Sequence, residues 1–267
     1  MAKLTDGITF TGFLGGLSAY KMRGSDKIIL RQPGGMTKEQ IKRLPETSLI
    51  KLNNSEWSAC AKASREVRDA MGQLRVLAGY NLAGPMNAMA KAIQKLDPVN
   101  VWGKRSVAYS AHRYMLEGFN LNRQNIFDSV VRSPVQVGIE RETGSATITL
   151  PQMVKGVNLV LPWKWPVYRF LINLGVLPDM VYNEAAKRYG DPHRRMIPYV
   201  DTYKTEWHSA QKSFPGQTAD LQLQRVETMP DPSSLLVTVG IQMGNMISAD
   251  QVDPVKYASC AKVLAVV

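Results

Sequence analysis

Two pairs of residues have the Ser-x-x-Lys spacing that places a lysine beside a serine nucleophile on one turn of a helix. They are Ser18 with Lys21 and Ser209 with Lys212. The first pair lies in an expected strand, where side chains three residues apart point to opposite faces, and the second has no helical context. No other pattern pairs a nucleophile with a base, or two carboxylates, at a suitable spacing. The sequence therefore predicts a protein that is not an enzyme.

Neither a metal site nor a nucleotide site is indicated. None of the three histidines, His112, His193 and His208, has the partner three or four residues away that metal ligation on one element would use. The glycine-rich segment 12–16 (GFLGG) superficially resembles a phosphate loop, but no Lys-Ser or Lys-Thr pair follows it and the next segment is an expected strand. We expect no metal and no cofactor.

Two short clusters have the composition of a binding surface. In segment 191–195 (DPHRR) a histidine with two arginines has the chemistry to contact phosphate, although a polar loop before a strand is the simpler interpretation. Segment 162–166 (PWKWP) alternates aromatic and basic residues, which favours either an interface anchored by Trp163 and Trp165 or a strand edge with its aromatic side chains packed inside the fold.

Positive charge is concentrated in the first half of the chain. Residues 1–127 contain 19 Lys and Arg against 9 Asp and Glu, whereas residues 128–267 contain 14 against 13. This asymmetry indicates an acidic partner, such as nucleic acid, an anionic surface or another subunit, unless it only keeps the surface solvated. The candidate contacts, which would bind backbone phosphates rather than read bases, are Lys21, Arg23, Lys27, Arg31, Lys62, Arg65, Arg68 and Arg75.

The first half is expected to begin with a β-meander and to continue as helices. Gly15-Gly16 and Gly24-Ser25 provide turns between three short strand patterns. Thr37 with Gln40 forms a capping box for a short helix, and Asn53-Asn54-Ser55 supplies the start of a long amphipathic helix. The expected strands are 8–13, 17–23 and 27–32, and the expected helices are 37–45, 55–78, 86–96 and 106–117.

From about residue 133 the apolar period changes to two, which predicts strands. Glu142-Thr143-Gly144-Ser145 turns the chain between two alternating segments, so that 135–150 forms a hairpin. One short helix is expected at 179–188. The other expected strands are 157–161, 167–174, 197–205, 218–226, 235–243 and 257–266.

These elements predict an α+β fold. Its first part, 1–127, contains the β-meander and a helical hairpin, and its second part, 128–267, is an antiparallel, immunoglobulin-like β-sandwich. No low-complexity linker separates the two parts, so the boundary is soft.

The N-terminal segment carries a resemblance to a known family. Tyr20, Lys21 and Gly24 form a tyrosine-basic-x-x-glycine turn, and a basic strand containing Arg31 follows. Over residues 12–35 this arrangement is similar to the opening of an uncharacterised bacterial protein family. That family has no established activity, so the resemblance implies a β-rich fold and assigns no functional residue.

Composition predicts a folded protein, and the lack of an export signal or a membrane span predicts a cytoplasmic one. Hydrophobic residues make up 45% and charged residues 21%, which supports a packed core. The N-terminus lacks the apolar run of a secretory signal, and the most apolar later segment, 157–181, is interrupted by charges and prolines. Cys60 and Cys260 are expected to be reduced, buried thiols.

The interpretation that we favour is a structural or interaction protein that associates with copies of itself, as a homo-oligomer or a filament. The unequal charge of the two halves permits head-to-tail contacts, and an apolar final strand must be covered by its own sheet or by another subunit. Sequence-nonspecific nucleic-acid binding through the basic half is the alternative function. The candidate interface residues are Trp163, Trp165, Val263, Leu264, Val266 and Val267.

Overall fold

A computed structural model describes the backbone of residues 2–3 and all of residues 10–22, 26–32, 34–192, 199–224, 231–248 and 251–267. The chain forms two compact units, Met1–Lys51 and Leu52–Val267. The boundary that we expected near residue 128 differs from the observed boundary between Lys51 and Leu52. Helices and strands from both sides of residue 128 share one core.

The first unit contains a small antiparallel sheet with strand order β1-β4-β3-β2, which we call the N-terminal sheet. Gly15 and Gly16, both with positive φ, turn the chain between β2 and β3. The expected meander is therefore confirmed over its described residues. Helix α1 follows, and Thr37 and Gln40 form the predicted capping box at its start. The elements are β1 (Ala2–Lys3), β2 (Gly12–Leu14), β3 (Leu17–Lys21), β4 (Ile28–Arg31) and α1 (Lys38–Arg43).

Helix α2 (Leu49–Ala70) begins at the end of the first unit, and the second unit contains the remaining elements. Its helical elements are η1 (Gly72–Leu77), α3 (Ala83–Lys95), η2 (Arg113–Met115) and α4 (Phe127–Val130). Its strands are β5 (Gln136–Glu140), β6 (Ser145–Leu150), β7 (Val167–Pro178), β8 (Val181–Asn183), β9 (Arg188–Gly190), β10 (Val200–Lys204), β11 (His208–Ser209), β12 (Gln217–Gln222), β13 (Ser233–Met246) and β14 (Val252–Val266).

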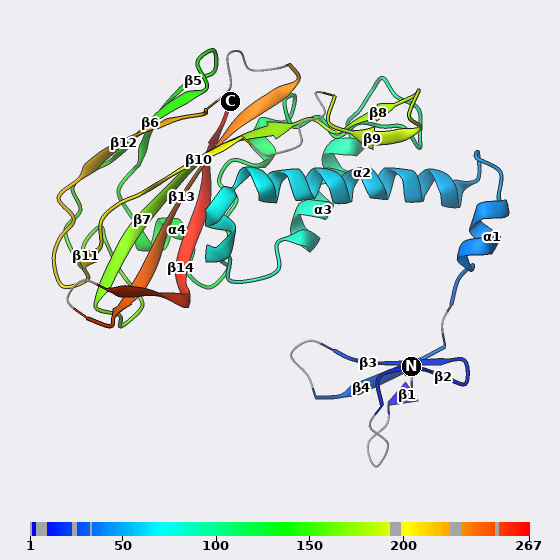
Figure 1. The fold of residues 1–267 in the computed structure, drawn as a ribbon, viewed down its shortest axis with the longest axis horizontal. Coiled ribbons are helices and arrows are strands. Elements are labelled where there is room, and N and C mark those ends of the chain that lie inside the picture. Colours follow the sequence, from blue (N-terminus) through cyan, green and yellow to red (C-terminus); the bar gives the residue numbers. More distant parts are fainter. Residues whose placement is uncertain are drawn as a thin grey trace. The chain divides into compact units, whose positions relative to one another are not determined.

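A central antiparallel sheet with the order β10-β7-β13-β14 organises the second unit, and β11 also pairs with β7. A three-stranded sheet, β12-β6-β5, lies on one side of it, and α2, η1 and α3 lie on the other (Figure 1). The mixed composition and the antiparallel sheets confirm the α+β class. They do not establish an immunoglobulin-like sandwich.

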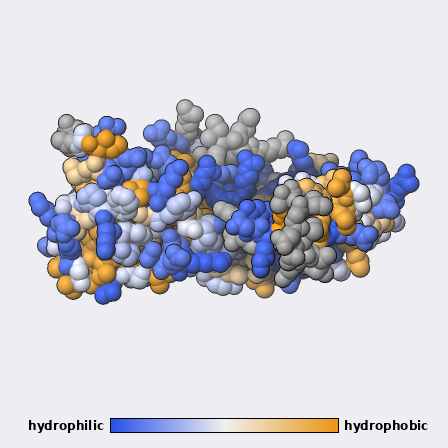
Figure 2. Space-filling view, turned by 90° about the horizontal axis from the view of Figure 1, so that it is seen from below, coloured by the Kyte–Doolittle hydropathy of each residue, from blue (hydrophilic) through white to orange (hydrophobic). Residues whose placement is uncertain are grey.

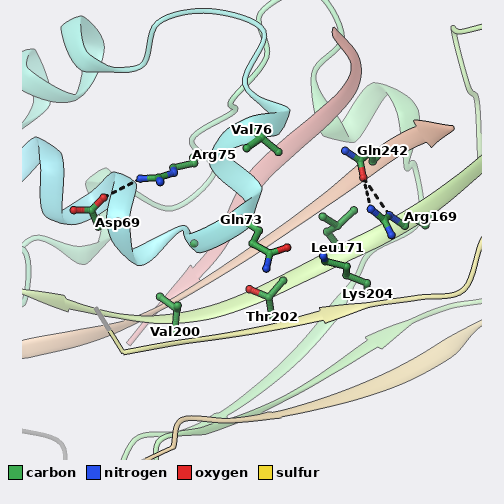
Figure 3. A pocket seen from close by; sticks show the side chains of 11 residues that line it. Asp69, Gln73, Arg75, Val76, Arg169, Leu171, Val200, Thr202, Lys204 and Gln242 are labelled. Atoms are coloured by element: carbon green, nitrogen blue, oxygen red, sulfur yellow. Dashed lines mark hydrogen bonds and ion pairs between the residues drawn. The ribbon is translucent and has the colours of Figure 1, made fainter. Parts of the chain in front are cut away.

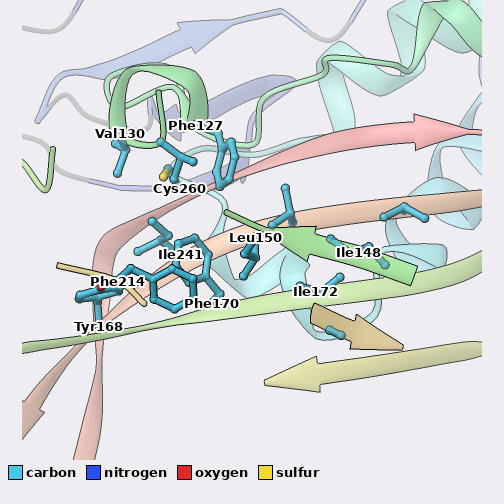
Figure 4. Packing of buried hydrophobic residues seen from close by; sticks show 14 of the residues in the cluster. Phe127, Val130, Ile148, Leu150, Tyr168, Phe170, Ile172, Phe214, Ile241 and Cys260 are labelled. Carbon is cyan, nitrogen blue, oxygen red and sulfur yellow. The ribbon is translucent and has the colours of Figure 1, made fainter. Parts of the chain in front are cut away.

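The two long central strands are buried on both faces. In β7, Phe170 and Ile172 point into the core shared with the three-stranded sheet, whereas Leu171 points into the core shared with the helices (Figure 4). In β13, Leu235 and Leu236 divide between the two cores in the same way. Burial on both faces explains why these strands read as nearly continuous apolar runs instead of clean alternation.

Two glycines let the helical layer approach the central sheet closely. A Cβ atom at Gly175 would overlap the carbonyl group of Ala70, and one at Gly240 would lie 2.6 Å from a methyl group of Leu77. Asn173, beside Gly175 on β7, donates a hydrogen bond of 2.8 Å to the same Ala70 carbonyl oxygen. The end of α2 is thereby fixed on β7, and the end of η1 packs closely on β13.

A buried carboxylate joins the helices of the second unit. Glu56 on α2 is fully buried, accepts two hydrogen bonds from Arg105 (2.6 and 2.7 Å) and contacts Lys91 on α3 at 2.6 Å. The backbone N–H of Gly103 donates a further bond of 3.0 Å. Burial acts to raise the pKa of Glu56, but the hydrogen bonds from Arg105 and Lys91 outweigh it and lower the pKa to about 2.

Three local helix predictions were wrong. The long helix begins at Leu49 and not after Ser55, because the Ser48 hydroxyl accepts a hydrogen bond from the Lys51 N–H at the helix start. Segment 106–117 contains only the short η2, since Val107 pairs with Met180 instead. Segment 179–188 folds mainly as the β8–β9 hairpin rather than a helix.

The hairpin 135–150 is confirmed as β5 and β6. Strands also form within or across 167–174, 197–205, 218–226, 235–243 and 257–266, although the ends of some of these segments lie outside the described residues. Segment 157–161 forms only isolated bridges. No helix within the described ranges is long and apolar enough to cross a membrane.

We predict that Glu56→Gln lowers the free energy of unfolding at pH 7 by about 3 kcal/mol, because Arg105 and Lys91 lose their buried counter-charge. The folded-state pKa lies below the ordinary value of 4.5, so the carboxylate contributes fully above pH 4.5 and its contribution is lost as the pH falls towards about 2. Urea unfolding at neutral and acidic pH measures this difference.

The matched control is Glu142→Gln, because Glu142 is exposed. This control should unfold like the wild type at both pH values. An equal loss of stability for Glu56→Gln at pH 7 and at about pH 2.5, between the two pKa values, would show that the charge of Glu56 is not what stabilises the fold.

Candidate functional site

The N-terminal sheet exposes large apolar side chains. Phe13 is 76% exposed and Leu14 63%, whereas Ala19 is the one buried side chain among the described residues of the first unit. Figure 2 shows one face of the molecule, on which hydrophobic residues reach the surface in patches among hydrophilic ones. A sheet of this size normally needs a packed apolar face to be stable. The N-terminal sheet therefore has the character of a binding surface.

The strand register divides these apolar residues between two faces. Phe13 pairs with Ser18, and Tyr20 pairs with Ile29, so these residues share one face. The opposite face carries the pair Leu14–Leu17 and the pair Ala19–Leu30. Each face thus presents apolar side chains, and among the described residues of the first unit no buried cluster covers either face.

The basic residues expected on the meander lie around this sheet. Lys21 forms an ion pair of 2.7 Å with Asp26, and the Arg31 guanidinium carbon lies 5.4 Å from the centre of the Tyr20 ring. Lys27 is exposed. Arg23 lies outside the described residues.

The basic residues expected on the long helix are mostly engaged within the protein. Arg65 and Arg75 share Asp69, at 3.3 and 3.0 Å, and Lys62 donates a hydrogen bond of 2.8 Å to the backbone oxygen of Tyr189. Arg68 donates to the Ser64 hydroxyl at 3.0 Å. This side of the helix therefore offers less uncompensated charge than the sequence indicates.

Trp163 and Trp165 line one groove but differ in burial. Trp163 packs against the core between the two sheets, whereas Trp165 is 37% exposed. Lys155 and Lys164 contribute to the same groove, which has a volume of about 490 Å³. Trp163 thus follows the packed interpretation, whereas Trp165 lies at the surface and stays a candidate interface residue.

The candidate residues at the end of β14 belong to the chain's own sheet. Val263 and Val266 are buried in the core beneath the helices, and Leu264 packs against the other core. Val267 exchanges two backbone hydrogen bonds with Leu235, at 2.7 and 2.9 Å. β14 is thus covered by its own fold over these residues.

The outer edge of β14 is also occupied within the chain over residues 261–266. Val263 exchanges backbone hydrogen bonds with the segment 118–119, and the Leu121 N–H donates to Ala261 at 2.8 Å. Glu117 accepts a hydrogen bond from the Val266 N–H. An edge covered in this way does not present free backbone groups to a neighbouring strand.

In the described part of the chain, no three His, Cys, Asp or Glu side chains gather as metal ligands would. His208 packs against Tyr168 and Phe214, and burial lowers its pKa. His193 lies outside the described residues. Cys60 and Cys260 are free and buried, as predicted, and burial raises their pKa values to about 11 and 12.

A basic pocket on the helix-facing side of the central sheet was not found by sequence reasoning. It has a volume of about 660 Å³, and three cationic side chains from separate elements contribute to it: Arg75 from η1, Arg169 from β7 and Lys204 from β10 (Figure 3). Arg169 donates two hydrogen bonds to Gln242, at 3.1 and 2.8 Å. The only sequence signal was one arginine inside a strongly apolar strand.

Comparison with known proteins gives no further guide, since no family model, curated protein or solved structure matches this chain.

We predict that Val263→Ala destabilises the fold by about 2 kcal/mol without changing the native mass, because the lost methyl groups come from the chain's own core. Urea unfolding and sedimentation measure the two quantities. Val99→Ala, at a side chain that is 84% exposed, is the control and should change neither. A Val263→Ala protein that stays fully stable but dissociates from an oligomer would place Val263 in a subunit interface instead.

Proposed function

We propose that this is a non-enzymatic structural or interaction protein that associates with copies of itself through the N-terminal sheet. The observation that carries the proposal is the exposure of apolar side chains on both faces of that sheet. Burial of one Phe or Leu side chain contributes about 1.5–3 kcal/mol. Covering Phe13, Leu14 and Leu17 together would therefore supply a large part of the affinity of a stable contact.

The two-faced arrangement favours an assembly of more than two copies. If one face of the sheet packs on a neighbour, the other face stays available for the next copy. Contacts that repeat in this way produce rings when they close and filaments when they do not. Residues 261–267 at the end of the chain are covered within their own fold, which favours the N-terminal sheet over the C-terminal residues as the interface.

The positive charge of the first unit opposes close approach of two copies. The ion pair between Lys21 and Asp26 offsets part of this repulsion, and salt screens the remainder. Association through the apolar faces should therefore strengthen as the salt concentration rises. Binding of nucleic acid would respond to salt in the opposite direction.

Nucleic-acid binding is the second candidate. The exposed Lys27 and the stacked Arg31 support it, while the internal contacts of Lys62, Arg65 and Arg75 weigh against it.

We also propose an immunoglobulin-like sandwich for the second unit and a cytoplasmic location for the protein. Two antiparallel sheets that enclose one core support an immunoglobulin-like sandwich in the second unit. Two free thiols support a reducing compartment such as the cytoplasm.

We predict that the double variant Phe13→Lys with Leu14→Lys shifts the native mass of the full chain from an assembly to a monomer. Both side chains are exposed, so the substitution removes apolar contact area and adds repulsion without disturbing the described core. Light scattering coupled to gel filtration, at several protein and salt concentrations, measures the mass. Circular dichroism checks that the variant stays folded.

The matched control places a lysine on the exposed Val99 of the second unit and should assemble like the wild type. A wild-type chain that is monomeric at every concentration would overturn the proposal. Assembly that survives in the Phe13 and Leu14 variant would move the interface away from the N-terminal sheet.

A further inference from the structure

The basic pocket lies where the helical layer stops covering the central sheet. Arg169 on β7 is paired directly with Gln242 on β13, and the next residue on the same face of β7, Leu171, is paired with Lys204 on β10. Arg169 and Lys204 are therefore diagonal neighbours on one face, with backbones about 7–8 Å apart. Two long cationic side chains at this separation can reach one ligand group.

The charges in the pocket are unequally compensated. Asp69 is its one acidic lining residue, and Asp69 already binds Arg65 and Arg75. Within the described ranges, no carboxylate contacts Arg169 or Lys204. The pocket thus contains two positive charges that no carboxylate of the described residues neutralises.

Arg169 is also held in a fixed orientation. Its guanidinium carbon lies 4.4 Å from the centre of the Trp207 ring, and its Nε and Nη2 atoms donate to Gln242. Trp207 in turn lies against Gly244, where an added Cβ atom would come within 2.6 Å of the ring. These contacts use two of the five N–H groups of the arginine and leave the others for a ligand. Arg169 is half-buried, and this burial lowers its pKa.

We propose that this pocket binds a small organic molecule through a phosphate monoester group, which Arg169 and Lys204 hold between them. A dianionic phosphate balances both charges, whereas a single carboxylate balances only one. The volume of about 660 Å³ is within the usual range for small-molecule sites. Val76 and Leu171 supply apolar contacts, and Gln73 and Thr202 supply hydrogen-bonding groups for the organic part.

Isothermal titration calorimetry in a phosphate-free buffer of low ionic strength tests this assignment on the full-length chain. The probes are glucose 6-phosphate, glucose and inorganic phosphate. Saturable binding is expected for glucose 6-phosphate, weaker binding for inorganic phosphate and none for glucose. Arg169→Gln and Lys204→Gln should each weaken binding of glucose 6-phosphate about tenfold or more, as loss of a charge-assisted contact requires.

Lys95→Gln is the matched control, because Lys95 is exposed on α3 and does not line the pocket. Its affinity should equal that of the wild type. Lys204 is exposed, so Lys204→Gln retains the test if Arg169→Gln fails to fold. Absence of binding by the wild type, or affinity unchanged in a folded Arg169→Gln or Lys204→Gln protein, would overturn the proposal.

A short oligonucleotide with a terminal phosphate, compared with its unphosphorylated form, separates a small-molecule site from a nucleic-acid site. If the pocket is a small-molecule site, both forms of the oligonucleotide should bind at Arg169 no more tightly than glucose 6-phosphate does. Tight binding of both forms that is lost in Arg169→Gln, without binding of glucose 6-phosphate, would reject the small-molecule ligand in favour of nucleic acid.

Discussion

The burial of the central sheet on both faces is the constraint on which the second unit depends. Strands β7 and β13 place successive side chains in two different cores, one against a sheet and the other against helices. Both layers must therefore be present for either strand to be covered. Gly175 and Gly240 allow the helical layer to sit close enough to complete the second core. Where that layer ends, the same strand face becomes polar, and the basic pocket occupies this position.

Two charged side chains in the second unit differ in how they are compensated. Glu56 is fully buried and bound by Arg105, Lys91 and the Gly103 backbone, so its charge serves to join α2 to α3 and to the following loop. Arg169 is half-buried and bound by a neutral amide and an aromatic ring. A buried charge without an opposite charge is costly to the fold, which is why the first arrangement is structural and the second is more typical of a binding site.

Local patterns in the sequence predicted those elements whose signals are local. The capping box of Thr37 and Gln40, the hairpin after residue 135 and the Gly15-Gly16 turn each depend on residues a few positions apart. The errors arose where distant contacts decide. Segment 179–188 has helix-forming residues, yet it pairs as a hairpin in which Lys187 adopts a positive φ and the rings of Tyr182 and Tyr189 meet. The basic pocket was not predicted because its residues come together through the register of three strands, and local sequence patterns do not determine that register.

The N-terminal sheet contrasts with the second unit because its described residues form no comparable core. Hydrogen exchange of its backbone amides, followed by mass spectrometry across a range of protein concentrations, tests whether a second copy covers it. Self-association predicts that protection within β2, β3 and β4 rises with concentration, while protection within β7 and β13 stays constant. Exchange in the N-terminal sheet that is independent of concentration would contradict self-association through this surface.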